Sequence, residues 1–177
     1  MELALLALRL VVGLTFAAHG AQKLFGVFGG GGIAGTAGAF DQIGLRPVKI
    51  QAWVAAVSEF VAGLLIALGL ATPFAAAALI GVMTAAVLSV HLPYGFFNTS
   101  NGYEYNLVLA AAAFALAGTG PGDWSLEYAL DTELAGTGWA LAALGAGVVG
   151  GVGAVQSGRF VARRAAGQTK PESTRAA

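Results

Sequence analysis

The sequence predicts an all-α protein, a transmembrane helix bundle with a four-helix core and a fifth, C-terminal transmembrane helix. Three observations lead to this fold class. Of the 177 residues, 57% are hydrophobic and only 10% are charged. Soluble domains carry roughly 25% charged residues on average, so this chain has too few to cover a soluble globule. The mean hydropathy is +0.76, and the apolar residues gather in stretches that approach the ~20 residues of a membrane-spanning helix.

Five stretches reach, or nearly reach, the length of a membrane-spanning helix. They cover about residues 3–25, 50–70, 74–92, 103–117 and 139–155, and the fourth is short. The second and third are separated only by the tight turn Ala71-Thr72-Pro73, so these helices should be antiparallel neighbours. Pro73 suits a first helical turn, where its missing N–H is no loss.

A further short helix is expected between the first and second spans. After a run of four glycines, apolar residues recur at helical spacing at Ile33, Ala37, Phe40 and Ile43. This pattern predicts an interfacial or re-entrant helix that ends at Gly44 and Pro47. Residues 93–102 are expected to form a polar and aromatic loop.

The chain therefore divides into a membrane domain, residues 1–157, and a tail, residues 158–177. The tail is small, polar and basic, which predicts a disordered segment. The N-terminus lacks the basic region of a cleaved signal peptide and its apolar run is long, so it is expected to remain as the first span.

Charge predicts the orientation, because Lys and Arg concentrate on the cytoplasmic side of membrane proteins. The first loop carries Arg46 and Lys49, and the tail from Arg159 to Arg175 has five basic residues and one acid. The connection between the fourth and fifth spans has four acids and no base. Five spans with the N-terminus outside put both basic segments in the cytoplasm. We therefore expect a multi-pass protein of the plasma membrane with a cytoplasmic tail.

Ionisable and polar side chains in or beside the spans are the candidate functional site. Such residues are costly in lipid and usually face a bundle interior, a partner or a wet cavity. The candidates are Arg9, His19, Lys23, Glu59, His91, Glu104 and Tyr105. Because consecutive spans alternate in direction, all of these except Arg9 and Glu59 should lie near one membrane face.

Two ion pairs are expected within this set. Glu59 lies near the middle of its span and Arg9 only about five residues from the middle of the first, roughly 7 Å along the axis at 1.5 Å per residue. We therefore predict an Arg9–Glu59 ion pair, and Glu104 could pair with Lys23. The alternative is that such pairs only fix the register of the helices and take no part in turnover.

Glycines predict two close helix contacts. Gly13 and Gly20 flank the polar stripe of the first span, and Gly147 and Gly151 are four residues apart in the fifth, a spacing that lets helices approach closely. Residues 145–150 also match G-x-G-x-x-G. They lie inside an apolar stretch with no preceding strand, so no dinucleotide site is expected.

Cofactor chemistry in this chain is limited by its composition. Cysteine is absent, so the chain supplies no disulfide, thiolate nucleophile or cysteine-ligated iron–sulfur cluster. No metal site is expected. A haem held by His19 and His91 is disfavoured because His91 is near the end of its span and His19 is deeper; either histidine could instead be a satisfied interfacial residue. No nucleic-acid partner is expected, since a basic flank of a spanning helix suits anionic lipid.

Several motifs together resemble the DoxX-like family of small membrane proteins, over about residues 3–130. They are Leu8-Arg9-Leu10, His19 to Gly26 (HGAQKLFG), Phe40 to Pro47 (FDQIGLRP), Glu59 within SEFVAGLLIALGLATPFAA, His91, Glu104-Tyr105-Asn106, and Gly120-Pro121-Gly122 with Ser125 and Glu127. The resemblance implies a four-helix membrane bundle, here extended by one helix and the basic tail. It also implies a component of a membrane oxidoreductase complex. The family is similar to a subunit of a thiosulfate:quinone oxidoreductase, and some members are linked to a complex with a sulfurtransferase and a superoxide dismutase that defends against oxidative and thiol stress.

Three functions remain open from the sequence. The first is a subunit of a redox complex that contacts a quinone or a small sulfur oxyanion, with electrons arriving through a partner or the quinone. The second is a proton or small-solute transporter, which in so small a chain would need a homo-oligomer. The third is a scaffold that anchors soluble partner enzymes in the lipid bilayer.

Overall fold

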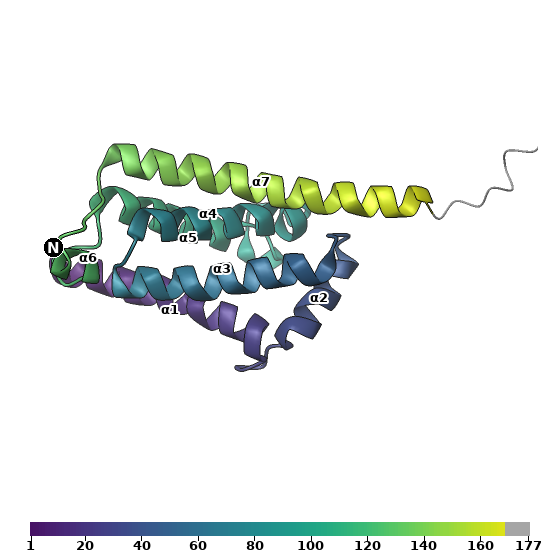
Figure 1. Cartoon of the computed structure of the whole chain (residues 1–177), viewed down its shortest axis with the longest axis horizontal. Coiled ribbons are helices and arrows are strands. Elements are labelled where there is room, and N and C mark those ends of the chain that lie inside the picture. The colour runs from purple at the N-terminus through teal and green to yellow at the C-terminus, as the bar shows by residue number, and fades with distance from the viewer. Residues whose placement is uncertain (169–177) are drawn as a thin grey trace, which may run out of the picture.

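A computed structural model describes residues 1–168 as a bundle of long helices that run side by side (Figure 1). In chain order the α-helices are α1 (Glu2–Phe25), α2 (Gly32–Gln42), α3 (Val48–Leu68), α4 (Thr72–Ala86), α5 (Glu104–Thr119), α6 (Leu126–Ala129) and α7 (Thr137–Gln168). A π-helical turn, Val87–His91, and a 3-10 turn, Leu92–Tyr94, prolong α4. Within the described residues there is no strand, and the predicted all-α bundle is confirmed.

Four helices are long and apolar enough to cross a membrane. They are Glu2–Phe25, Val48–Leu68, Thr72–Tyr94 and Thr137–Gly167, while α5 is a shorter apolar helix of 16 residues. At 1.5 Å per residue α5 is about 24 Å long, somewhat less than the ~30 Å of a hydrocarbon core. The five predicted stretches fall on these five helices, except that residues 69–70 and 103 lie just outside them, and the helix expected after the glycine run is α2.

The ends of the long helices follow from local sequence. Gly26 and Gly69 stand directly after α1 and α3 with φ of 73° and 63°, the left-handed conformation that glycine adopts without strain. Thr72 and Pro73 then open α4, so only a short turn separates α3 from α4. The result is the antiparallel α3–α4 pair that the sequence predicted.

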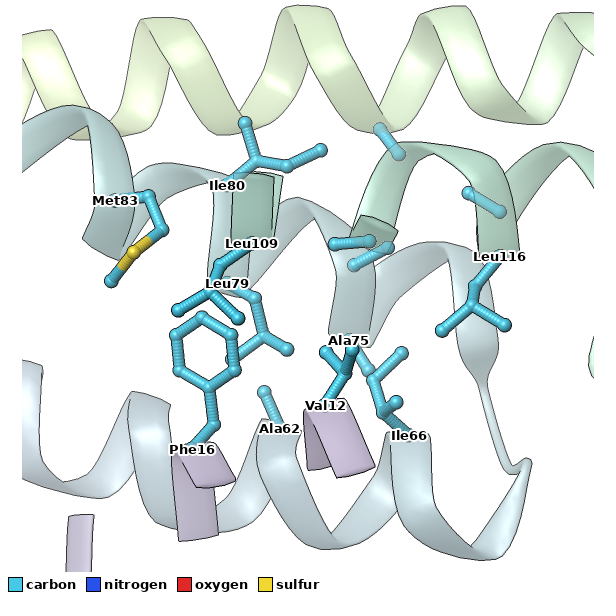
Figure 2. Close-up of a cluster of buried hydrophobic side chains, with 14 residues drawn as sticks. Val12, Phe16, Ala62, Ile66, Ala75, Leu79, Ile80, Met83, Leu109 and Leu116 are labelled. Carbon is cyan, nitrogen blue, oxygen red and sulfur yellow. The ribbon is translucent and has the colours of Figure 1, made fainter. Parts of the chain in front are cut away.

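The hydrophobic core lies between α1, α3, α4 and α5, with α7 against its outer side (Figure 2). Its larger members are Val12, Phe16, Ile66, Leu79, Ile80, Met83, Leu109 and Leu116. Small alanines fill the positions between them, which lets the four helices pack tightly without voids.

Glycines set the distance between two pairs of helices. A methyl group added to Gly13 would lie 2.5 Å from a backbone nitrogen of α3, and one added to Gly20 would collide with Phe60 of the same helix. On the other side of the bundle, methyl groups on Gly147 and Gly151 would lie 2.7 and 2.5 Å from backbone carbonyls of α4. Helices α1 and α3, and helices α4 and α7, therefore touch through their backbones.

The boundary predicted at residue 158 needs correction. Instead of ending near residue 155, α7 continues as a helix to Gln168 and projects beyond the other helices (Figure 1). Two contacts hold residues 158 and 159 of α7 against the bundle: the Gly158 carbonyl accepts a bond from the Arg46 N–H, and Arg159 donates to the carbonyl of Leu88. The remainder of the predicted tail, residues 169–177, lies outside the described residues.

Candidate functional site

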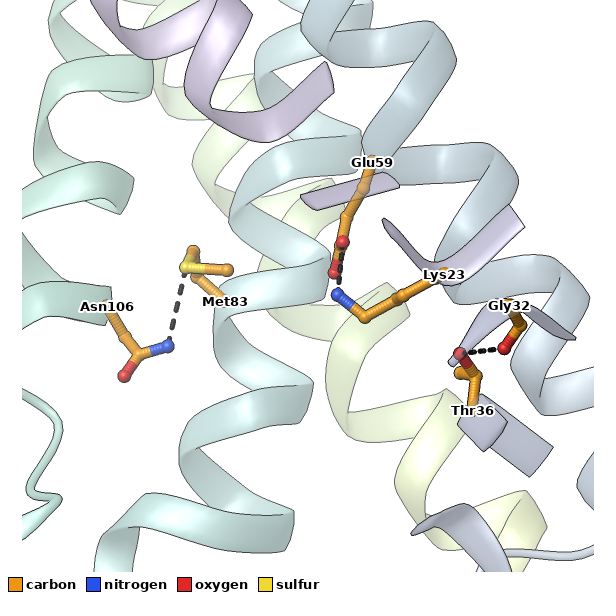
Figure 3. A network of polar contacts seen from close by, with 6 residues as sticks. All are labelled: Lys23, Gly32, Thr36, Glu59, Met83 and Asn106. Atoms are coloured by element: carbon orange, nitrogen blue, oxygen red, sulfur yellow. Dashed lines mark hydrogen bonds and ion pairs between the residues drawn. The ribbon is translucent and has the colours of Figure 1, made fainter. Parts of the chain in front are cut away.

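A buried ion pair joins α1 to α3. Lys23, in the last turn of α1, donates from Nζ to Oε2 of Glu59, in the middle of α3 (Figure 3). The Glu59 side chain is 5% exposed and that of Lys23 is 29% exposed. Because a charge is costly at bilayer depth, both side chains gain from facing each other here.

The predicted Arg9–Glu59 pair is therefore wrong. Helices α1 and α3 contact each other where Gly20 meets Phe60, and Lys23 is three residues beyond Gly20 on the same face of α1. That contact places Lys23 beside Glu59 and puts Arg9 near Gly69, at the C-terminal end of α3. The axial position of a residue in its span does not reveal which basic side chain packing brings to Glu59.

A cavity of about 460 Å³ lies beside this ion pair, between α2, α3, α4 and α7. Its walls are mostly apolar, with side chains such as Ile43, Val54, Val82 and Val155. The polar residues in its lining are Lys23, Gln51, Ser58, Glu59 and Ser89. This volume and the small number of polar groups are typical of a small-molecule site.

Glycines of α7 form part of the cavity wall. Gly147 and Gly151 approach α4 closely, and Gly150 beside them also lines the cavity. The side chain of Gln51 donates to the carbonyl of Ala154 at 3.3 Å, which ties α3 to α7. The cavity is thus bounded by a helix contact at α4–α7 and by a polar bridge at α3–α7.

The other predicted site residues do not line this cavity. Oε2 of Glu104 accepts a bond from the Asn98 N–H at 3.0 Å, so Glu104 does not pair with Lys23. Nδ1 of His91 lies 2.7 Å from the carbonyl oxygen of Asn101. His19 and Tyr105 lie on the outer surface of the bundle. Of the set expected near one membrane face, the structure brings only Lys23 to the cavity, where it meets Glu59.

A second polar cluster closes the opposite end of the bundle. Arg9 is 1% exposed and donates from Nη2 to the carbonyl of Trp124, in the connection between α5 and α7. Glu127, also 1% exposed, accepts bonds from the backbone N–H groups of Thr72 and Leu134. The charge of Glu127 also attracts that of Arg9.

Glu127 is one of the four acids of this connection and is not among the residues predicted for the site. The sequence signal that could have identified Glu127 is the Gly-Pro-Gly motif with Ser125 and Glu127. In the structure, the connection folds back onto the bundle at this motif. Nη1 of Arg9 packs against Gly69, where any added methyl group would overlap it. This cluster is filled by the chain's own atoms, whereas the ion pair of Lys23 and Glu59 borders an open volume.

Comparison with known proteins places these residues in context. The family model described as DoxX matches residues 4–92, which span α1 to α4 and include Arg9, Lys23 and Glu59. The chain is 30% identical over 118 residues to the protein named "Putative oxidoreductase CatD" of Bacillus subtilis (strain 168), covering 67% of this chain and 81% of that protein. It is also 30% identical over 135 residues to "Uncharacterized membrane protein Rv3486" of Mycobacterium tuberculosis (strain ATCC 25618 / H37Rv), covering 71% and 80%. No solved structure matches.

Proposed function

This chain belongs to the DoxX family of membrane proteins, and from that premise we propose that it is the membrane subunit of an oxidoreductase and binds a quinone in the cavity beside Lys23 and Glu59. The single observation that carries this proposal is the ion pair in the wall of a mostly apolar cavity. The relative named as an oxidoreductase supports the reaction class.

The lining favours a quinone over a small sulfur oxyanion. An oxyanion surrounded by protein needs several hydrogen-bond donors or cations, because burying an unpaired charge is very costly. The cavity offers one cation, which is already paired with Glu59, and three neutral polar side chains, Gln51, Ser58 and Ser89, within a mostly apolar lining. A quinone presents an apolar ring with neutral carbonyl oxygens, which matches that surface.

The residues have separate tasks in this proposal. The Lys23 ammonium donates a hydrogen bond to a carbonyl oxygen of the quinone, and the Glu59 carboxylate keeps the ammonium oriented and can hold a proton near it. When bound, a quinone supplies an acceptor for two electrons and two protons. Electrons would come from a partner enzyme of a thiol or sulfur-compound redox complex in the plasma membrane, in defence against oxidative stress.

Entry from the lipid fits the shape of the cavity. Val54 and Val90 belong to its lining and are also 54% and 39% exposed, so the cavity reaches the outer surface of the bundle. In a membrane protein this surface faces lipid, where quinones are dissolved.

Quinone binding by the purified protein tests the proposal. The full-length chain in lipid nanodiscs is titrated with a short-chain benzoquinone and a short-chain naphthoquinone. We expect saturable binding, and a Kd raised about tenfold in Lys23→Met, since a hydrogen bond to a charged group contributes about 1.5–3 kcal/mol. Lys49→Met is the matched control, because Lys49 is exposed at the start of α3 and does not line the cavity.

Other outcomes distinguish the alternatives. If neither quinone binds the wild-type protein, the proposal fails. Solute flux into liposomes that stops in Glu59→Gln would then identify a transporter. Soluble enzymes that co-purify equally with the wild-type protein and with Lys23→Met would instead identify a scaffold.

A further inference from the structure

Ser89, a residue that lines the cavity, carries a hydroxyl group that has no partner. Oγ of Ser89 is buried and makes no hydrogen bond within the described part of the chain. A helical serine usually bonds to a carbonyl three or four residues earlier, as Ser157 does to Ala154 at 2.9 Å. The other buried side-chain atoms without a partner in residues 1–168 belong to Arg9 and Thr72, and neither lines the cavity.

The backbone around Ser89 departs from an α-helix. Residues Val87–His91 form a π-helical turn, a rare feature that is frequent at functional sites. The carbonyl of Leu88, next to Ser89, accepts a hydrogen bond from Nη2 of Arg159 at 2.9 Å. Arg159 belongs to α7, so a side chain from another helix holds the turn that carries Ser89.

Ser89 and the ion pair occupy different walls of the cavity. Glu59 is on α3 and Ser89 is on the prolonged α4, and these antiparallel helices meet at the turn after Gly69. Counted from that turn at 1.5 Å per residue, Ser89 lies roughly 10 Å farther along the bundle than Glu59. A ligand with one polar end would leave one of these positions unused, whereas a quinone has oxygens on both sides of its ring.

We infer that Ser89 is a second ligand-binding residue, which hydrogen-bonds one oxygen of a two-oxygen ring ligand while Lys23 bonds the other. This inference rests on the proposed quinone site. It assigns the π-helical turn and Arg159 to positioning the Ser89 hydroxyl, and it predicts that the site prefers ligands with oxygens at both ends of an apolar ring.

The test compares Ser89→Ala with Ser157→Ala in lipid nanodiscs. Each protein is titrated with a short-chain naphthoquinone and with an analogue of the same ring that carries one carbonyl. The wild-type protein should bind the quinone at least about fivefold more tightly than the analogue, the range expected for one added hydrogen bond. Ser89→Ala should lose this preference by binding the quinone more weakly. Ser157→Ala should keep it.

Thermal unfolding without ligand supplies the second readout. Removing an unpartnered buried hydroxyl should leave the Tm unchanged or raise it, because no internal bond is lost. If Ser89→Ala binds the quinone as tightly as the wild type, or if it lowers the Tm, the inference is overturned while the quinone site stands. If the wild-type protein binds neither ligand, the quinone site and this inference both fail.

Discussion

The two charge clusters differ at the residue scale in what surrounds their charged groups. Glu127 is held by two backbone N–H groups and attracts Arg9, which is itself bonded to a backbone carbonyl. Lys23 donates to Glu59 and borders a cavity, so its ammonium group retains N–H donors that a ligand can use. We therefore expect the first cluster to stabilise the fold, and we place the proposed ligand at the second.

Arg9→Met should destabilise the protein by about 3 kcal/mol, because it leaves the Glu127 carboxylate buried without its compensating charge. The measurement is equilibrium unfolding of the purified protein in detergent, with Glu127→Gln and the double variant in parallel. If Arg9 and Glu127 interact, the double variant loses less than the sum of the two single losses. Losses that add would show that the two charges act independently.

The sequence could predict three of the charges that meet inside the bundle, Arg9, Lys23 and Glu59, but not how they pair. Arg9, Lys23 and Glu59 stand out because ionisable residues are rare in apolar stretches. Their pairing depends on the rotation of α1 against α3, which Gly13 and Gly20 set by backbone contact. The role of Glu127 depends on a connection that folds back across the bundle, a long-range feature with no local periodicity.

At the element scale, backbone contact between helices is what places the site. Gly13 on α1 faces Gly63 and Ala67 on α3, and this contact together with Gly20 brings Lys23 to Glu59. Small residues let membrane helices pack closely where no hydrophobic effect drives them together. The expected spans were recovered because apolar length is a local property, while residues 158 and 159 of α7 bond to Arg46 and Leu88, which are distant in sequence.

Gly13→Ala should cost about 2 kcal/mol of stability, because its methyl group would overlap the backbone of α3 and force the helices apart. It should also weaken quinone binding, since Lys23 moves with α1. Gly145→Ala is the control: nothing lies within 4 Å of its added methyl group, so stability should be unchanged or slightly higher. Unfolding in detergent and quinone titration measure both effects. Equal stability of the two variants would contradict a tight α1–α3 contact.

At the scale of the whole molecule, the two clusters lie toward opposite ends of the bundle. The α5–α7 connection with its acids and Arg9 belongs to one end. The loop that carries Arg46 and the start of α3, with Lys49, belong to the other, together with the projecting part of α7 (Figure 1). This segregation of charge could be expected from sequence, because alternating helices put alternate loops on the same side. The cavity could not be predicted from the sequence. It is a gap between α3 and α7 that forms only because both helices pack against α4.

The positive-inside rule predicts that the basic end faces the cytoplasm. The natural chain has no cysteine, so single replacements at Glu133 and Lys49, both exposed and at opposite ends, report directly on sidedness. A membrane-impermeant maleimide should label Glu133→Cys in intact cells and Lys49→Cys only after the membrane is opened. The reverse labelling pattern would show that the protein is inserted the other way.

The bond between Arg9 and the Trp124 carbonyl joins positions that are 115 residues apart, and this has a consequence for biosynthesis. When α1 leaves the ribosome, the segment that will receive its guanidinium has not yet been translated. The first helix must therefore wait, with its cation near lipid headgroups or the insertion machinery, until helices α2 to α5 and the start of the α5–α7 connection have followed. A nascent chain truncated before residue 124 would carry an unsatisfied arginine in the membrane, a defect that quality-control proteases can recognise.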